Sequence, residues 1–300
     1  MSASQNDSGR AFEYSLSYSL AEKLVIPLEL RSISVINKQS FEEQAPSEKI
    51  NLIEAADHAV EFLIQNDLFF QSRDNVFEIK SMTDKSGEEG DVRDIIITNQ
   101  HGVTRGISAK NRHHAIKHSR LSQTIDFGKV WMNSSCSVEY FSCIRPIFDT
   151  LKKLKSEKLK WSEIESKADK FYLPILHCFC TEIERILTNN PDASKALLEY
   201  LLGRFDFYKI VKENGSVKID SFNLRGKLGW GKQLPTAVST IQIGLVENST
   251  NKVMLIFNQG WQISFRIHNA STYVEPSLKF DIQPVGFPSS MGQHEIRYKS

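Results

Sequence analysis

Hydrophobic residues recur with helical spacing in the first part of the chain. Phe12, Leu16, Leu20 and Leu24 lie four residues apart, which predicts the apolar face of a helix within residues 9–24. A second apolar stripe predicts a helix that begins at Ser47 and carries Ile50, Ile53, Ala56, Val60, Leu63 and Ile64. Residues 76–82 then change to the short apolar pattern of a strand. We therefore expect two helices followed by the start of a sheet.

A β-hairpin is predicted directly after this strand. Asp94 opens a run of three isoleucines, and a polar turn over residues 99–102 reverses the chain. A second apolar run, residues 106–109, ends on Lys110. Two β-branched runs joined by a turn that contains Asn and Gly are typical of a hairpin. Asp94 and Lys110 are therefore expected at neighbouring strand ends.

The second half of the chain predicts a helical block followed by strands. Helical spacing returns in residues 138–155, 161–187 and 193–202, and strand patterns separated by Gly, Asn and Pro follow from residue 206. The expected fold is α/β (α+β), with a mixed sheet flanked by helices, a helical insertion and a β-rich C-terminal part. The expected division is a catalytic core at 1–135, a helical scaffold at 136–204 and a β-rich part at 205–300.

Composition is that of a soluble globular protein. Of the 300 residues, 40% are hydrophobic and 24% are charged, and the net charge is +1. No stretch reaches the roughly 18–20 apolar residues of a membrane helix, and the polar N-terminus lacks the apolar region of a secretory signal. We therefore expect a cytoplasmic protein with no membrane partner. The spacings of the four cysteines do not match a zinc site, so these thiols are expected to be reduced and mostly buried.

Three acids and one lysine are candidates for chemistry on a phosphodiester. A carboxylate at Asp94 and an ammonium at Lys110 could reach the same phosphate, as in the PD-(D/E)xK nuclease core, or the two could be solvated strand ends. Glu13 could be favoured by the dipole of the first helix, or it could supply an extra metal-binding acid. Asp91, at the preceding turn, is more easily explained as a solvated loop residue.

A basic segment follows Lys110 over residues 112–129. A helix is expected from about Arg112 to Leu121, which would place Arg112, Lys117 and Arg120 on one surface. Such a cluster could contact DNA phosphates, or it could be an ordinary basic surface. His114 and His118 have the spacing of a helical metal pair, but no third ligand follows at a known spacing.

The β-rich part carries side chains suited to reading bases. Arg225, Arg266 and Asn269 could bond to purine edges in the major groove, since Arg and Asn can do so bidentately. Exposed Arg and Asn are also ordinary in any β-rich protein.

Four sequence blocks resemble the HaeIII-type restriction endonucleases: GRAFEY, GDVRDIII, GISAKNRHHAIKHSRLS and WQISFRIHNASTYVEPSLKFDIQPVG. The resemblance implies a PD-(D/E)xK type II restriction endonuclease that needs Mg²⁺ and cuts double-stranded DNA at GGCC, between the inner G and C, to leave blunt ends. It also implies a cognate DNA methyltransferase in the same restriction–modification system. A palindromic target suits a homodimer, although a monomer that cuts one strand at a time is an alternative.

Carried over residue by residue, the resemblance makes Asp94 the metal-binding acid, Lys110 the catalytic lysine and Glu13 the acid of the first helix. Ser108 stands where the wider superfamily has the acid of its ExK motif. The second metal ligand would then be Glu13, Asp91 or a backbone carbonyl. Two other classes remain: a non-catalytic, sequence-specific DNA-binding or regulatory protein, and a metal-dependent nuclease that uses His113, His114 and His118.

Overall fold

The computed structural model describes residues 5–71, 76–82 and 91–298 and divides the chain into two compact units. The first unit consists of residues 1–114, 203–234 and 290–300, and the second consists of residues 115–202 and 235–289. Each unit is therefore built from separated segments, whereas the sequence led us to expect three consecutive parts. Within the described ranges, no helix is long and apolar enough to span a membrane.

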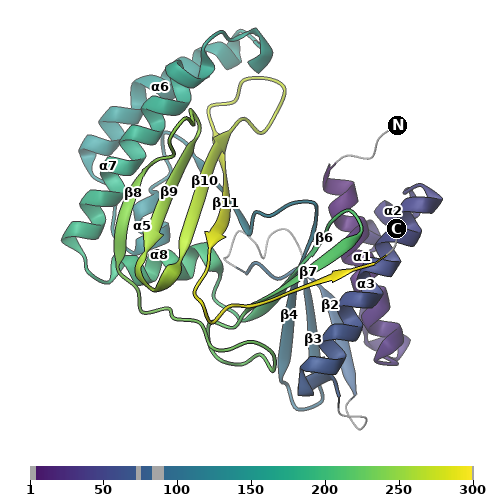
Figure 1. The fold of residues 1–300 in the computed structure, drawn as a ribbon. Coiled ribbons are helices and arrows are strands. Elements are labelled where there is room, and N and C mark those ends of the chain that lie inside the picture. The colour runs from purple at the N-terminus through teal and green to yellow at the C-terminus, as the bar shows by residue number, and fades with distance from the viewer. Residues whose placement is uncertain (1–4, 72–75, 83–90, 299–300) are drawn as a thin grey trace. The chain divides into compact units, whose positions relative to one another are not determined.

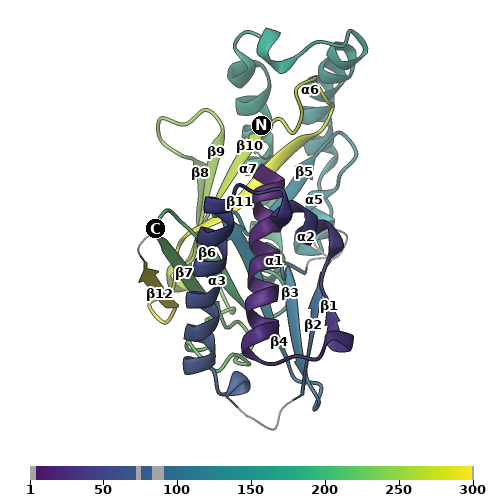
Figure 2. The same cartoon turned by 90° about the vertical axis from the view of Figure 1, so that its right-hand side faces the viewer.

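The first unit contains a mixed sheet with helices on one face (Figures 1 and 2). Among the described residues, seven strands run in the order β1-β2-β3-β4-β6-β7-β12, with β4 and β6 parallel. Their bounds are β1 (Arg31–Ser32), β2 (Phe77–Ser81), β3 (Ile95–Asn99), β4 (Thr104–Asn111), β6 (Phe207–Lys212), β7 (Ser216–Phe222) and β12 (Gly292–Arg297). The helices are α1 (Gln5–Lys23), α2 (Val35–Glu42) and α3 (Pro46–Asn66), with short turns η1 (Leu28–Leu30) and η2 (Leu68–Phe70).

Two of these helices follow the predicted periodicity. Phe12, Leu16 and Leu20 of α1 are fully buried in the core of the first unit, as their spacing predicts. Helix α3 begins at Pro46, one residue before the predicted start, and proline suits a first helical position because its missing N–H has no helical partner there. Ile50 is exposed rather than part of the buried face, which is formed by Leu52, Ala55, Ala56, Ala59, Val60 and Leu63.

The predicted hairpin is confirmed as β3 and β4. Ile95 is paired with Ile107, and the turn is closed by Asn99, whose Oδ1 accepts hydrogen bonds from the backbone N–H groups of His101 and Val103. Gly102 adopts a φ of 73°, which glycine tolerates without a Cβ clash. The hairpin lies inside the sheet, because β2 pairs with β3 and β6 pairs with β4. Together, sheet and helices confirm the expected mixed α/β fold.

The second unit contains another sheet, which is packed against helices on one face (Figure 1). Over residues 115–202 and 235–289, five strands run in the order β5-β11-β10-β9-β8. Their bounds are β5 (Lys117–Leu121), β8 (Thr240–Leu245), β9 (Lys252–Phe257), β10 (Gln262–His268) and β11 (Leu278–Gly286). The helical elements are α5 (Phe127–Met132), η3 (Trp161–Glu163), η4 (Ala168–Tyr172), α6 (Val138–Ser156), α7 (Leu173–Asn189), α8 (Ala193–Leu202) and η5 (Asn258–Gly260).

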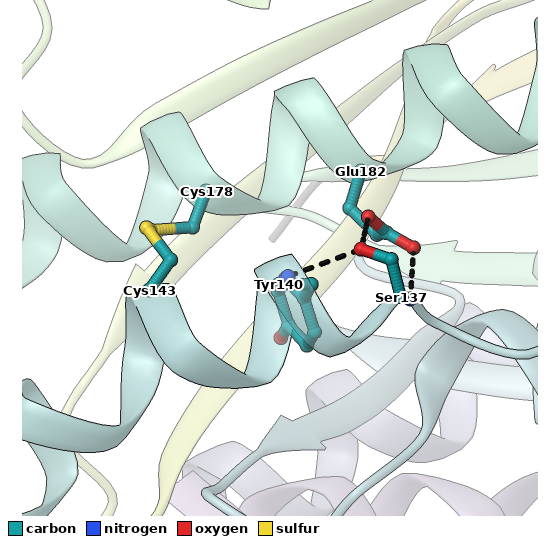
Figure 3. The surroundings of a disulfide bond; sticks show 5 residues. All are labelled: Ser137, Tyr140, Cys143, Cys178 and Glu182. Carbon is teal, nitrogen blue, oxygen red and sulfur yellow. Dashed lines mark hydrogen bonds between the residues drawn. A yellow bond between two sulfur atoms is a disulfide. The ribbon is translucent and has the colours of Figure 1, made fainter.

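Helix α6 and helix α7 are joined by a disulfide bond between Cys143 and Cys178 (Figure 3). The expectation of four reduced thiols is therefore wrong for this pair, which the packing of the two helices brings together across 35 residues of sequence. Cys136 and Cys180 are free thiols, and burial raises the pKa of each to about 12. These two thiols therefore stay protonated at neutral pH.

Candidate active site

The sheet of the first unit places Asp94 opposite β4, the strand that carries Lys110. The backbone N–H of Asp94 donates to the carbonyl of Ile107 at 2.7 Å, and its carbonyl accepts from Met82 N–H at 2.8 Å. These bonds extend the β2–β3–β4 ladder one residue before β3. Asp94 therefore lies across from Ser108, as the predicted strand ends require.

The Asp94 carboxylate is held through one oxygen by three consecutive residues of β4. Its Oδ2 accepts from Ser108 Oγ at 3.1 Å, from Ala109 N–H at 2.7 Å and from Lys110 Nζ at 3.0 Å. For the other oxygen, Oδ1, no hydrogen bond is recorded within the described residues. Both side chains keep some access to solvent, 23% for Asp94 and 20% for Lys110. The carboxylate is thus oriented while one oxygen remains available.

Lys110 is a cation in this setting. Burial lowers the pKa of Lys110, but the nearby carboxylates of Asp94 and Glu13 outweigh burial and raise the pKa above its ordinary value. An ammonium with a raised pKa cannot act as a general base near neutral pH. It can instead stabilise negative charge that develops on a phosphate.

Glu13 lies on α1 and joins this group from outside the sheet. Its Oε2 accepts from the side-chain amide of Asn37 on α2 at 2.9 Å, and its charge is close enough to Lys110 to raise that lysine's pKa. The structure therefore brings Glu13, Asp94 and Lys110 together. The sequence did not identify Asn37 as a partner of Glu13, because nothing in a short polar segment predicts a contact with a residue 24 positions away.

Asp91, the other candidate acid, forms an ion pair with Arg93. Its Oδ1 accepts from the backbone N–H of Arg93 and from Nε at 2.8 Å, and its Oδ2 accepts from Nη2 at 2.7 Å. Arg93 is buried, with its guanidinium 3.9 Å from the centre of the Phe205 ring. Gly106 makes room for it, since a Cβ there would lie 2.1 Å from Arg93 Cδ. This pairing favours Glu13 over Asp91 as the second acid.

The donor atoms at this site fit a hard divalent cation. Asp94 offers an oxygen for which no hydrogen bond to another described residue is recorded, and Glu13 offers a second carboxylate near Lys110. Carboxylate oxygens are the ligands that Mg²⁺ prefers, whereas zinc or copper would favour nitrogen and sulfur. Ser108, in place of an acid, bonds to Asp94 rather than offering a second carboxylate.

The basic segment after β4 is not the predicted helix. Residues 117–121 form strand β5, which pairs with β11, so their side chains alternate instead of sharing a helical face. Lys117 is buried, with Nζ donating to the carbonyl of Tyr200 at 3.2 Å and lying 3.5 Å from the centre of its ring. It does not have the solvent-facing position expected of a phosphate contact. Arg120 is exposed, and its Nη1 donates to Ser277 Oγ at 3.3 Å.

The remaining DNA-contact candidates lie in both units. Arg112 and Arg225 are exposed in the first unit. In the second unit, the Arg266 guanidinium donates to Oδ2 of Asp281, and Asn269 donates to the carbonyl of Ser271. Arg266 and Asn269 would have to exchange or share these bonds to read bases.

The histidines of the basic segment do not form the helical metal pair. Residues 112–116 lie outside any helix, so the i, i+4 geometry of His114 and His118 is absent. His114 Nε2 lies 3.0 Å from a Glu213 oxygen, and His118 Nδ1 lies 2.8 Å from an Asp281 oxygen. This argues against the helical arrangement that motivated a histidine-based metal site.

A protein family and a known protein are similar to this chain over most of its length. A family model described as HaeIII restriction endonuclease matches residues 9–288. The chain is 37% identical over 311 residues to the type II restriction enzyme HaeIII of Haemophilus aegyptius, and the match covers 97% of each sequence. No solved structure matches the chain. The resemblance carried by the four sequence blocks is confirmed, and the chain belongs to the HaeIII restriction endonuclease family.

Proposed function

We propose that this chain is a type II restriction endonuclease that hydrolyses both strands of duplex DNA at GGCC and leaves blunt ends, with Mg²⁺ as its metal. The observation that carries the proposal is the Asp94–Lys110 pair at neighbouring strand ends, with Glu13 beside it, in a chain that belongs to a restriction endonuclease family. The target sequence and the cleavage position rest on the family resemblance.

In the proposed reaction, water attacks a phosphodiester in line with the leaving oxygen. Asp94 Oδ1 and Glu13 would hold the metal, which when bound lowers the pKa of water and neutralises charge on the phosphate. Ser108 and the Ala109 N–H fix the Asp94 carboxylate so that it does not reorganise during the reaction. Lys110 stabilises the charge that develops on the phosphate oxygens.

DNA contacts are proposed for polar and charged side chains of both units. Arg112 and Arg120 are proposed to contact phosphates, and Arg225, Arg266 and Asn269 to read bases. Lys117 is not proposed as a phosphate contact, because it is buried against Tyr200. We also propose a partner methyltransferase that protects the host's GGCC sites, a cytoplasmic location, and a homodimer that would match a palindromic target.

The test is cleavage of a plasmid that contains GGCC, with and without Mg²⁺, followed by sequencing of the ends. Wild type should give blunt ends between the inner G and C, and a plasmid without GGCC should stay intact. Asp94→Asn and Lys110→Met should each lose activity, whereas Asp149→Asn, an exposed carboxylate of α6, should cut like wild type. DNA binding without any cleavage by wild type would favour the non-catalytic DNA-binding protein. Full activity of Asp94→Asn would favour the histidine-based nuclease.

A further inference from the structure

Strand β6, next to β4, carries a buried lysine that the proposed mechanism does not use. Lys209 is 3% exposed, and its Nζ donates a hydrogen bond to the backbone carbonyl of His114. Within the described residues the structure records no ion pair for Lys209. Burying an ammonium without a paired carboxylate is unfavourable, so a lysine at such a position calls for a role.

The strand register places Lys209 in a row with the candidate site. Lys209 is the pairing partner of Ser108 on one side and of Asp220 on the other. Ser108 bonds to Asp94, and Asp220 accepts from Gln293 Nε2 at 3.0 Å. The neighbouring positions Ile107, Ile210 and Ile219 are buried in the core with α1 and α3, so this row lies on the opposite face of the sheet.

Electrostatics link Lys209 to Lys110. Burial lowers the pKa of Lys209 to about 8, the Asp220 carboxylate opposes this effect, and the positive charge of Lys110 adds to it. The two ammonium groups therefore lie close enough to repel each other electrostatically. A methionine would fill this position without the unfavourable burial of a charge, so a purely structural role does not explain a lysine.

We propose that Lys209 is a positioning residue of the nuclease site, acting through the His114 carbonyl on residues 112–114, which directly follow β4, the strand that carries Lys110. The proposal rests on the proposed nuclease function. Lys209 fixes the end of the strand that carries Lys110, and the Asp220 carboxylate on the next strand offsets part of its charge without forming a recorded ion pair among the described residues. Loss of this anchor lets the Lys110 ammonium move away from the phosphate, and of the proposed DNA contacts Arg112 alone lies in the released segment. The effect therefore falls mainly on turnover, because the other proposed DNA contacts lie elsewhere in the chain.

The structure supplies a matched control in the same strand. Lys212 is also a buried lysine of β6, 2% exposed, but it points to the other face and pairs with Glu48 of α3 at 3.2 Å. Lys212→Met removes the same charge from the same strand without touching the row that contains Ser108. It should lower stability and leave turnover within threefold of wild type.

The experiment compares Lys209→Met, Lys209→Arg and Lys212→Met with wild type by steady-state cleavage of a GGCC duplex and by urea unfolding. We expect Lys209→Met to reduce kcat at least tenfold with KM changed less than threefold, and with no loss of stability. Lys209→Arg, which keeps a charged donor for the His114 carbonyl, should recover at least a third of the lost rate. Turnover of Lys209→Met within threefold of wild type overturns the proposal, and so does an equal kcat loss in Lys212→Met.

Three further outcomes bear on the proposal. If Lys209→Met does not fold, Asp220→Asn takes its place and must lower kcat at least threefold with KM unchanged, or the proposal fails. If wild type itself does not cut the duplex, the proposed nuclease function fails and this inference fails with it. If Lys209→Met turns over like wild type and Asp94→Asn is inactive, the proposed role of Lys209 is wrong and the proposed nuclease function stands.

Discussion

Replacing Lys209 by methionine should stabilise the protein at neutral pH, and the gain should disappear as the pH rises. Burial lowers the pKa of Lys209 from 10.5 to about 8, with Asp220 and Lys110 as the charged groups that act on it. Each unit of pKa difference corresponds to about 1.4 kcal/mol, so the folded state carries a penalty of about 3 kcal/mol below pH 8. Lys209→Met also loses the hydrogen bond to His114, worth about 1 kcal/mol. The expected net gain is about 2 kcal/mol.

The direction of the pH dependence is set by the pKa of Lys209, which is lower in the folded protein than in the unfolded chain. Between about pH 8 and 10.5 the unfolded chain keeps the Lys209 proton and the folded chain loses it, so wild-type stability rises with pH in this window. The advantage of Lys209→Met should therefore shrink by about 1 kcal/mol between pH 7 and pH 9. Other groups with shifted pKa values, such as Cys136, titrate in both proteins and cancel in the difference.

The measurement is urea unfolding of wild type, Lys209→Met and Lys212→Met at pH 7, 8 and 9, with a constant m value as the test of two-state behaviour. Lys212→Met leaves Glu48 without its partner and should be less stable than wild type at each pH. A Lys209→Met protein that is less stable than wild type at pH 7, or whose advantage does not change with pH, would refute the reasoning. Lys209 would then be a stabilising core lysine.

Three further results are expected. Asp94→Asn should lower the cleavage rate at least tenfold, a loss of about 1.4 kcal/mol or more in the barrier, measured in single-turnover assays. Glu13→Gln should raise the Mg²⁺ concentration needed for half-maximal rate, whereas Asp91→Asn should mainly lower stability through its lost Arg93 pair; the reverse ranking would make Asp91 the ligand. Arg120→Ala should weaken binding to GGCC and scrambled duplex alike and reduce the salt slope by roughly one, which a filter-binding salt series can check.

Features set by short-range pattern were predictable from the sequence. The spacing of Phe12, Leu16 and Leu20 fixes which face of α1 is buried, and the isoleucine run with its Asn-Gly turn fixes the hairpin. Because both strands are adjacent in sequence, their turn also sets the register that brings Asp94 to Lys110. The candidate acid and lysine could therefore be placed without any long-range information.

Features set by distant partners were not predictable. Residues 117–121 carry a mixture of Lys, His, Ser and Arg that suits a helix or a strand, and their pairing with β11, far away in sequence, decides for a strand. The same pairing turns Lys117 inward and leaves Arg120 outside. Residues 117–121 show no apolar alternation in the sequence, because four of the five are polar, and the period-two pattern lies in their burial. Lys209 stands between apolar residues of β6 in the sequence, but that pattern does not show that Ser108 lies beside it, because this neighbour is set by the parallel register of β4 and β6.

The residues next to position 108 explain why a serine, and not an acid, stands there. A carboxylate there would face the Lys209 ammonium across the β4–β6 register and would be drawn into an ion pair with it. Serine instead donates to Asp94 Oδ2 and joins Ala109 and Lys110 in holding that oxygen, so that the orientation of Asp94 is set by three donors. In the proposed site the second acid then has to come from outside the sheet. Glu13 on α1 satisfies this requirement, because a helix that approaches the end of β4 can supply a carboxylate without placing it beside Lys209.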